Sequence, residues 1–306
     1  MNLEELICKR FTESKKLTKD LAVYSGSPAV FSPEAPADNQ PGWDGRTQYP
    51  RIEYTFDMQA DQERKSAGTL SVSLYCKNIM EIPEEESVTE GVVYGTAKTA
   101  EIEAEVKACL RDVLLKTGDG TLYAFAWART DAFTMPEKNH DFVIGSEIRF
   151  DILEYPIQET TDPDPVEAAN KYIKELYPDS IVIGLDQMEE ITEASRDTPV
   201  IYCRLISVEK GRETNTVAWM DGRIAVHILC PDSGVRMKMA AAITNEMSLD
   251  GEIIMLDDSP MTVSRLQADY QSDYLKEGQI FLTGHYGLLR YREKGHTLRQ
   301  TKNNYS

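Results

Sequence analysis

The side chains that most often do chemistry are few and scattered in this sequence. Four histidines are present, and no two are close together: His140, His227, His285 and His296. His227 lies between Val226 and Ile228 in a strand pattern, which is typical of a partly buried or interface histidine without an acid–base partner. The sequence contains neither H-E-x-x-H nor a cysteine–histidine spacing typical of zinc sites. We therefore expect no metal site and no histidine-centred catalysis.

Cysteines and acidic residues point the same way. The five cysteines are odd in number, lack C-x-x-C spacing and lie in apolar patterns typical of core thiols in a reducing compartment: Cys8, Cys76, Cys109, Cys203 and Cys230. The carboxylate pairs Asp162/Asp164 and Asp257/Asp258 could bind Ca²⁺ or Mg²⁺, but such pairs are more often caps and turns. Phosphate-binding glycine motifs and G-x-S-x-G are absent. We predict no catalytic residues, no cofactor and no metal; an enzyme with an unrecognised site is the less favoured alternative.

The charge of the chain limits its partners. Its 306 residues include 51 acidic and 33 basic ones, a net charge of −18. Such a surface repels nucleic acid and anionic lipid, so DNA gripping is disfavoured, although DNA could slide past. No apolar run approaches the roughly 20 residues of a membrane span, and Met1–Phe11 carries acids in a helical pattern unlike a secretory signal. We expect a soluble protein made in a cytoplasm.

An internal duplication is the clearest pattern in the sequence. Gly68–Asn78 matches Gly222–Asp232 without a gap, and upstream of each block Pro50–Phe56 aligns with Pro199–Leu205. In the longer blocks the apolar residues fall on every second position, the period of a strand with one buried face. Matching blocks in matching order predict two tandem copies of one domain.

Helices flank the paired strands in each copy. The first copy opens with a helix in which Asn2 and Glu5 could form a capping box, and the second opens at Asp164-Pro165, a good cap followed by proline. A second helix runs from Ile102 to Val113 in the first copy. With two further strands, each copy reads helix, strand, strand, helix, strand, strand. This order predicts an α+β fold with a mainly antiparallel sheet packed on helices.

The predicted boundaries follow from this repeat: copy 1 over 1–156, a linker over 157–164, copy 2 over 165–289, and a basic tail over 290–306. The tail holds Arg290 and Arg292, and its composition indicates a flexible tail or a docking arm for an acidic neighbour.

Two connections in copy 1 are longer than usual, 24–49 and 79–100. Long loops in compact domains are usually functional or disordered. The first holds Trp43 and Arg46, and the second holds Glu84, Glu85 and Glu86, with no equivalent in copy 2. We expect these loops, with Arg290 and Arg292, to contact neighbours in an assembly.

One copy resembles the tail terminator (tail-completion, minor tail) proteins of long-tailed bacteriophages. The resemblance depends on the opening helix, the proline-rich loop Ser32–Pro36, the segment Tyr49–Tyr54 entering a strand, the strand Leu70–Cys76, the helix from Glu101 and the hairpin ending at Ile148–Tyr155. The same order recurs from Pro165 to about Leu289. Typical members have a single such domain, so the duplication departs from the family pattern.

The resemblance implies a structural virion protein of the tail and neck, assembled in the host bacterial cytoplasm. It would form a ring of six chains, or of three chains that mimic sixfold symmetry, and cap the head-proximal end of the tail tube. Its partners would be the tail-tube protein and sheath or neck proteins, with DNA passing through unbound and no membrane contact. Another connector or stopper protein of the neck, or the equivalent part of a phage-derived particle, is the alternative.

Overall fold

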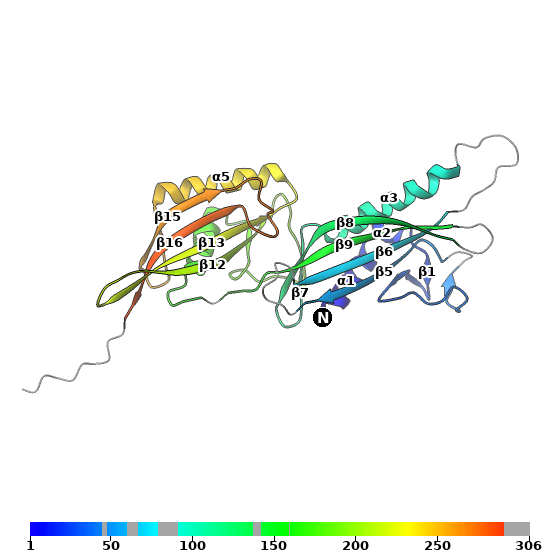
Figure 1. Cartoon of the computed structure of the whole chain (residues 1–306), viewed down its shortest axis with the longest axis horizontal. Coiled ribbons are helices and arrows are strands. Elements are labelled where there is room, and N and C mark those ends of the chain that lie inside the picture. The colour runs from blue at the N-terminus through cyan, green and yellow to red at the C-terminus, as the bar shows by residue number, and fades with distance from the viewer. Residues whose placement is uncertain (45–47, 60–66, 79–90, 137–141, 159, 291–306) are drawn as a thin grey trace, which may run out of the picture.

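The computed structural model describes residues 1–44, 48–59, 67–78, 91–136, 142–158 and 160–290 (Figure 1). Two large sheets follow one another along the longest axis of the molecule. The first has seven strands in the order β11-β7-β8-β9-β6-β5-β3. Its strands are β3 (Val30–Phe31), β5 (Arg51–Met58), β6 (Gly68–Asn78), β7 (Val113–Lys116), β8 (Leu122–Pro136), β9 (Phe142–Glu154) and β11 (Ile191–Glu193).

The second sheet has six strands in the order β10-β12-β13-β16-β15-β14. They are β10 (Ile181–Val182), β12 (Val200–Glu213), β13 (Val217–Leu229), β14 (Glu252–Ile254), β15 (Pro260–Ala268) and β16 (Ile280–Leu289). Neighbouring strands in both sheets are antiparallel, except that β3 pairs with β5 and β10 with β12 in parallel. Without β11, the first sheet therefore has the same strand order and directions as the second.

The register of the central hairpins is also the same in the two sheets. Ile52 of β5 lies opposite Leu74 of β6, and Ile201 of β12 lies opposite Ile228 of β13. These are the residues that the sequence alignment of the two copies makes equivalent. Because a slip of one residue would turn every side chain to the other face, the shared register keeps the apolar sets on equivalent faces.

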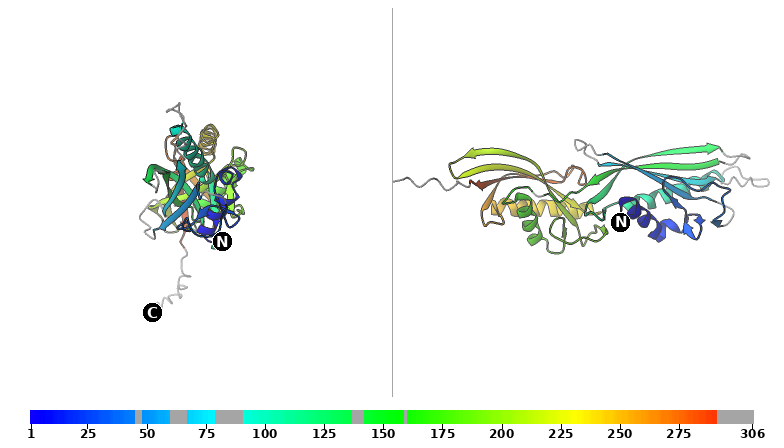
Figure 2. Two further views of the ribbon diagram at one scale, coloured as in Figure 1. Left: turned by 90° about the vertical axis from the view of Figure 1, so that its right-hand side faces the viewer. Right: turned by 90° about the horizontal axis from the view of Figure 1, so that it is seen from below.

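Helices line one side of each sheet. They are α1 (Leu3–Glu13), α2 (Lys15–Thr18) and α3 (Gly91–Leu110) in the first repeat, and α4 (Pro165–Leu176) and α5 (Ser233–Asp250) in the second. The capping box of Asn2 with Glu5 and the cap of Asp164 at α4 are both confirmed. In the right-hand view of Figure 2 the helices of both repeats lie below the sheets, so the open faces of both sheets turn to the same side.

Each repeat has its own core between helices and sheet. In the first, the fully buried Leu6 and Phe11 of α1 meet Val72 of β6. In the second, Ile173 of α4 and Ile243 of α5 meet Val226 of β13. These side chains come from the helical stripes and from alternate strand positions, so apolar periodicity places both cores.

The fold class predicted from the sequence was wrong. The protein is mostly β, with 44% of residues in strands and 23% in helices, arranged as two curled half-barrel sheets and a small third sheet. The predicted order of helices and strands in each copy left out the short strands β3, β7 and β10. It also underestimated strand length, because β8 has 15 residues and β12 has 14, each running past its apolar alternation.

Three local expectations also need correction. Val113 was assigned to the second helix of copy 1, but α3 ends at Leu110 and Asp112 adopts a left-handed conformation with φ 54°, so Val113 opens β7 instead. The connection 79–100 is shorter than expected because α3 begins at Gly91; residues 79–90 lie outside the described part. The connection 24–49 is partly ordered as strands, since it holds β3 and most of the third sheet.

The third sheet is small, with the strand order β2-β1-β4. Its strands are β1 (Val23–Tyr24), β2 (Ser27–Pro28) and β4 (Trp43–Asp44). β4 lies at one end of this order, and it pairs with β1 through Tyr24 opposite Trp43. The aromatic residues Tyr24 and Trp43 therefore help to order the connection 24–49, in which we predicted Trp43 as a contact residue.

Candidate functional site

The two repeats are joined by a strand that crosses from one to the other. β11 belongs by sequence to the second repeat but pairs antiparallel with β7, placing Thr192 opposite Leu114. Two backbone bonds frame the pairing. The Lys116 N–H donates to the Glu190 carbonyl at 2.8 Å, and the Ala194 N–H donates to the Asp112 carbonyl at 2.9 Å. The sheet of the first repeat is thus extended by a strand of the second.

A third buried core fills the junction between the repeats. It draws residues from both, and they are Leu114, Leu122, Ala124, Ala126, Leu153, Tyr155, Ile183, Ala194, Val200, Tyr202, Leu229 and Leu275. In the first repeat these side chains lie on the sheet face away from the helices. Because they alternate with residues of the helix-side core, β7, β8, β12 and β13 are covered on both faces near the junction. The repeats therefore share a core as well as a sheet.

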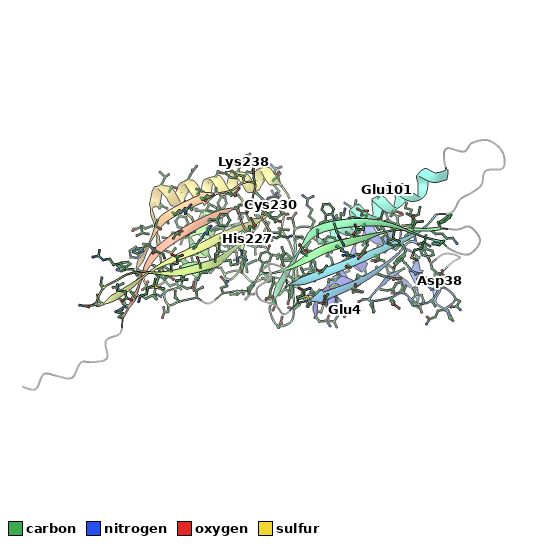
Figure 3. The ribbon with its side chains drawn as sticks, in the orientation of Figure 1. Glu4, Asp38, Glu101, His227, Cys230 and Lys238 are labelled. Carbon is green, nitrogen blue, oxygen red and sulfur yellow. The ribbon has the colours of Figure 1, made fainter. Side chains whose placement is uncertain are left out.

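An aromatic and histidine cluster lies within this junction. Rings of Tyr155 and Tyr202 meet edge to face with centroids 4.8 Å apart, and the His227 ring lies 5.7 Å and 5.5 Å from them. His227 is 1% exposed, and its Nδ1 is 2.8 Å from the Tyr274 carbonyl. Burial lowers the pKa of His227 to about 4. It is therefore neutral at pH 7 and donates from Nδ1 to that carbonyl; Figure 3 labels it on the second sheet.

Polar contacts also cross the junction. The Tyr274 hydroxyl donates to Asp112 Oδ1 at 2.6 Å, and the Tyr155 hydroxyl donates to the Leu275 carbonyl at 2.7 Å. Lys276 Nζ lies 2.6 Å from Asp151 Oδ2. All three involve the segment between β15 and β16 of the second repeat. That segment therefore fastens the second repeat to the first at several points.

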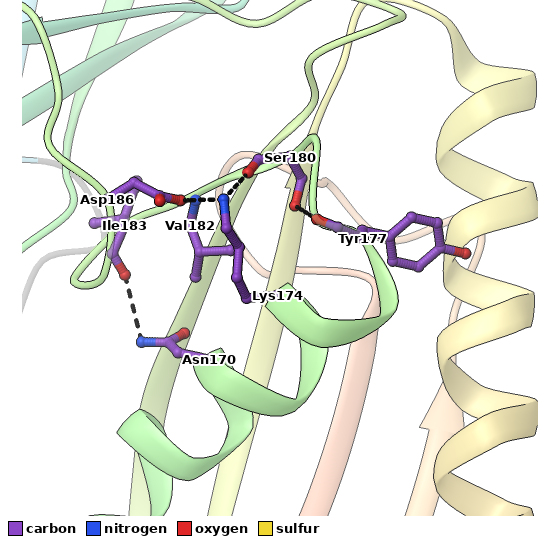
Figure 4. A network of polar contacts seen from close by, with 7 residues as sticks. All are labelled: Asn170, Lys174, Tyr177, Ser180, Val182, Ile183 and Asp186. Carbon is purple, nitrogen blue, oxygen red and sulfur yellow. Dashed lines mark hydrogen bonds and ion pairs between the residues drawn. The ribbon is translucent and has the colours of Figure 1, made fainter.

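A polar network fixes the chain that leads into β11. Lys174 of α4 donates to the Ser180 carbonyl at 2.7 Å and lies 2.9 Å from Asp186 Oδ2, which also accepts the Val182 N–H at 2.7 Å (Figure 4). Asn170 Nδ2 donates to the Ile183 carbonyl at 3.4 Å. Because these bonds hold the turn after α4, they direct the following residues toward the first repeat.

The open face of the first sheet is polar and its charges are paired. Ser73 of β6 lies between Glu53 and Glu147 of the neighbouring strands, and Ser71 lies opposite Arg149 of β9. The ion pairs on these strands are Arg51–Glu53 at 3.0 Å, Arg129–Asp131 at 3.1 Å and Arg149–Glu147 at 2.8 Å. Alternation of arginine with acid leaves this face without a strong field of one sign.

The open face of the second sheet carries a polar groove of about 500 Å³. It is lined by Ser207, Glu209, Asp221, Arg223, Ser264, Arg265, Gln267, Phe281 and Thr283. Beside it His285 Nδ1 lies 2.8 Å from Asp221 Oδ1, and the His285 ring stacks on Trp219 with centroids 4.9 Å apart. The two arginines and two acidic residues in this lining have charges that sum to zero.

The predicted contact residues are not brought together. Trp43 lies in β4, where its ring meets Tyr24 at 5.0 Å and Phe31 at 5.6 Å. Arg290 pairs within the chain, 2.7 Å from Glu213, so it is engaged beside the turn that joins β12 to β13. The other predicted residues lie outside the described part of the structure: Arg46, Glu84, Glu85, Glu86 and Arg292.

The described residues contain no group of three or more histidine, cysteine, aspartate or glutamate side chains able to hold a metal ion. All five cysteines are free thiols, and four of them are buried. No helix in the described ranges is both long and apolar enough to cross a membrane. The chain matches no protein-family model and no curated protein.

Sequence reasoning missed the junction, although a signal was present. Where β6 has Ser71, Ser73 and Tyr75 on its open face, the aligned positions of β13 are Ala225, His227 and Leu229. Loss of polar residues from one face of a strand indicates that this face is covered too. The three residues are buried, as this reasoning requires.

Proposed function

We propose that this chain is a structural ring subunit that closes the head-proximal end of a bacteriophage tail tube and joins it to the neck. The observation that carries the proposal is the junction: two repeats of one strand order, coupled by β11 on β7 and by a shared core. A chain built this way presents two ring positions already joined. This supports the interpretation in which fewer chains mimic a ring of more units.

The distribution of faces also supports this function. Helices of both repeats lie on one side and open sheet faces on the other (Figure 2). In a ring, one of these sides would line the channel. The open face of the first sheet pairs arginines with acids, as in Arg149–Glu147 and Arg129–Asp131, and the groove on the second sheet holds two arginines and two acids. The balance of positive and negative charges in these described parts of the two faces gives DNA little reason to release its counterions, which suits passage without binding.

The test is the mass and symmetry of the purified protein with and without the tail-tube protein of the same particle. Light scattering and negative-stain imaging should show rings with six or pseudo-six symmetry, or monomers that become rings on one end of each tube. Sixfold rings of six chains and of three chains differ twofold in mass. A compact monomer that ignores tubes contradicts the proposal. A thermal shift caused by a nucleotide or metal would instead favour an enzyme.

A further inference from the structure

The two repeats differ at one equivalent sheet edge. In the first, β7 lies next to the edge and is covered by β11; in the second, β14 holds the same place in the strand order and no described strand lies beyond it. An uncovered edge presents unpaired N–H and C=O groups that can pair with another chain. The second repeat thus lacks, within the described residues, the strand that the first receives.

The register shows which backbone groups β14 offers. Leu115 lies opposite Tyr123, and Ile253 lies opposite Met261 at the same place in the second sheet. Ile254 therefore corresponds to Lys116, whose N–H donates to the Glu190 carbonyl across the β7–β11 edge. By this equivalence the Ile254 N–H points away from its own sheet.

Apolar side chains are exposed around this edge. Ile254 is 56% exposed, Leu256 is 45% exposed, and Leu249 in the last turn of α5 is 80% exposed. An edge strand flanked by exposed apolar residues is either an interface or an aggregation hazard. A matching strand would cover both the backbone groups and part of this surface.

The first repeat contains the segment that corresponds to β11. Thr192 lies seven residues before Pro199, and Trp43 lies seven residues before Pro50, the aligned prolines of the two copies. Trp43 is in β4, at the end of the small sheet. The Ser25 N–H donates to the Gly42 carbonyl at 2.7 Å, so residue 42 faces β1 and the backbone groups of Trp43 face away from it. No described strand lies on that side of β4.

We propose that β4 of one chain adds to β14 of a second copy of this chain, repeating between chains the β11–β7 pairing that joins the repeats within a chain. The contact is head to tail, because each chain offers β4 from its first repeat and β14 from its second. The inference deepens the proposed function and rests on it for the closure of the chains into a ring. The strand addition itself is argued from the equivalence of β14 with β7 and of β4 with β11.

The first repeat has charged residues at two positions where the second repeat contributes to the junction core. The aligned counterparts of Val200 and Tyr202 are Arg51 and Glu53, which form an ion pair at 3.0 Å and whose side chains are each 14% exposed. Contacts between separately folded chains are in general more polar than a permanent core. This difference fits a contact that forms between separately folded chains.

Complementation between two full-length variants tests the proposal. Ile254→Pro removes the outward N–H of β14, and Trp43→Pro removes that of β4; both positions are on edge strands, where proline is tolerated. Each variant alone should remain monomeric in analytical ultracentrifugation, whereas Ile254→Val should assemble like the unmodified chain. An equimolar mixture should form a one-to-one dimer through the single intact pair of edges. Dimer formation would also show that both variants fold.

The outcomes separate this inference from the proposed function. If the variants and the unmodified chain form the same rings, strand addition at β14 is wrong while the ring subunit stands. If the mixture stays monomeric although both variants melt like the unmodified chain, the inference is likewise overturned. If the complementation succeeds but the unmodified chain makes open chains that never cap tubes, the inference holds and the tail-terminator function fails.

Discussion

Tyr274 and Asp112 bind each other across the junction, with the tyrosine hydroxyl 2.6 Å from Oδ1 of a carboxylate that is 4% exposed. Tyr274 belongs to the second repeat and Asp112 to the turn after α3 in the first. A buried carboxylate that loses its donor keeps its desolvation cost without the compensating bond. This pair therefore couples the fold of one repeat to that of the other.

Replacing Tyr274 with phenylalanine should lower the free energy of unfolding by about 1–3 kcal/mol, because Asp112 loses a charge-assisted hydrogen bond. Urea denaturation followed by circular dichroism measures the change. Tyr270→Phe is the matched control, since Tyr270 is 49% exposed, and should change stability by less than about 0.5 kcal/mol. Equal effects of the two substitutions would contradict the role given to the pair.

Stability should fall as pH falls from about 6.5 toward 4. Burial lowers the pKa of His227 to about 4 in the folded protein, against an ordinary value of 6.5. Between these values the unfolded chain binds the proton and the folded chain does not, so acid favours unfolding. The loss attributable to His227 should reach about 3 kcal/mol at the low end.

His227→Asn isolates this contribution, because asparagine can keep a donor near Nδ1 but does not titrate. Its free energy of unfolding, measured at several pH values, should depend less steeply on pH than that of the unmodified chain. Parallel curves for the two proteins would show that His227 does not lose its proton affinity on folding.

Leu114 and Leu115 are neighbours in β7 and are both fully buried, but Leu114 faces the junction and Leu115 the helix-side core. Each substitution by alanine should cost about 2–5 kcal/mol. Leu115→Ala should destabilise the first repeat. Leu114→Ala should instead uncouple the repeats, giving two calorimetric transitions and faster proteolysis near residues 157–164. Indistinguishable melting profiles would argue against a separate junction core.

Arg290→Ala should change stability by less than about 1 kcal/mol, because its ion pair with Glu213 joins side chains that are 42% and 36% exposed. Any larger effect on ring formation than on unfolding would assign Arg290 to a contact between chains. Comparing thermal melts with sedimentation of the same variant distinguishes the two roles.

Much of each repeat's interior could be predicted from the sequence, and the covered face of β13 left a signal, but the strand pairing that joins the repeats could not be predicted. Apolar alternation located β6 and β13, and cap chemistry located the starts of α1 and α4, because these signals are local. β7 and β11 have four and three residues, too few to show a period. Their pairing depends on residues distant along the chain, so no local pattern encodes it.

The residues of the proposed contact between chains were harder still to predict from the sequence. Trp43 was predicted as a contact residue of the long connection 24–49, and the structure places it in β4, at one end of the small sheet. Ile254 gave no such signal, because an isoleucine next to Ile253 suggests an ordinary buried strand. Only the comparison of two equivalent edges, one covered and one bare, distinguishes it.

The addition of β11 to the sheet at β7 has a consequence for synthesis. Once residues up to Tyr155 have emerged from the ribosome, the apolar interior of the first repeat is available for folding, whereas β11 and the junction side of β12 have not yet emerged. Until they emerge, Leu114, Leu122 and Tyr155 face water beside a bare edge. Nascent chains on one polysome would then expose identical unpaired strand edges and apolar side chains to one another, which favours aggregation. Rapid translation through 157–202, or a chaperone that shields this edge, would favour correct folding.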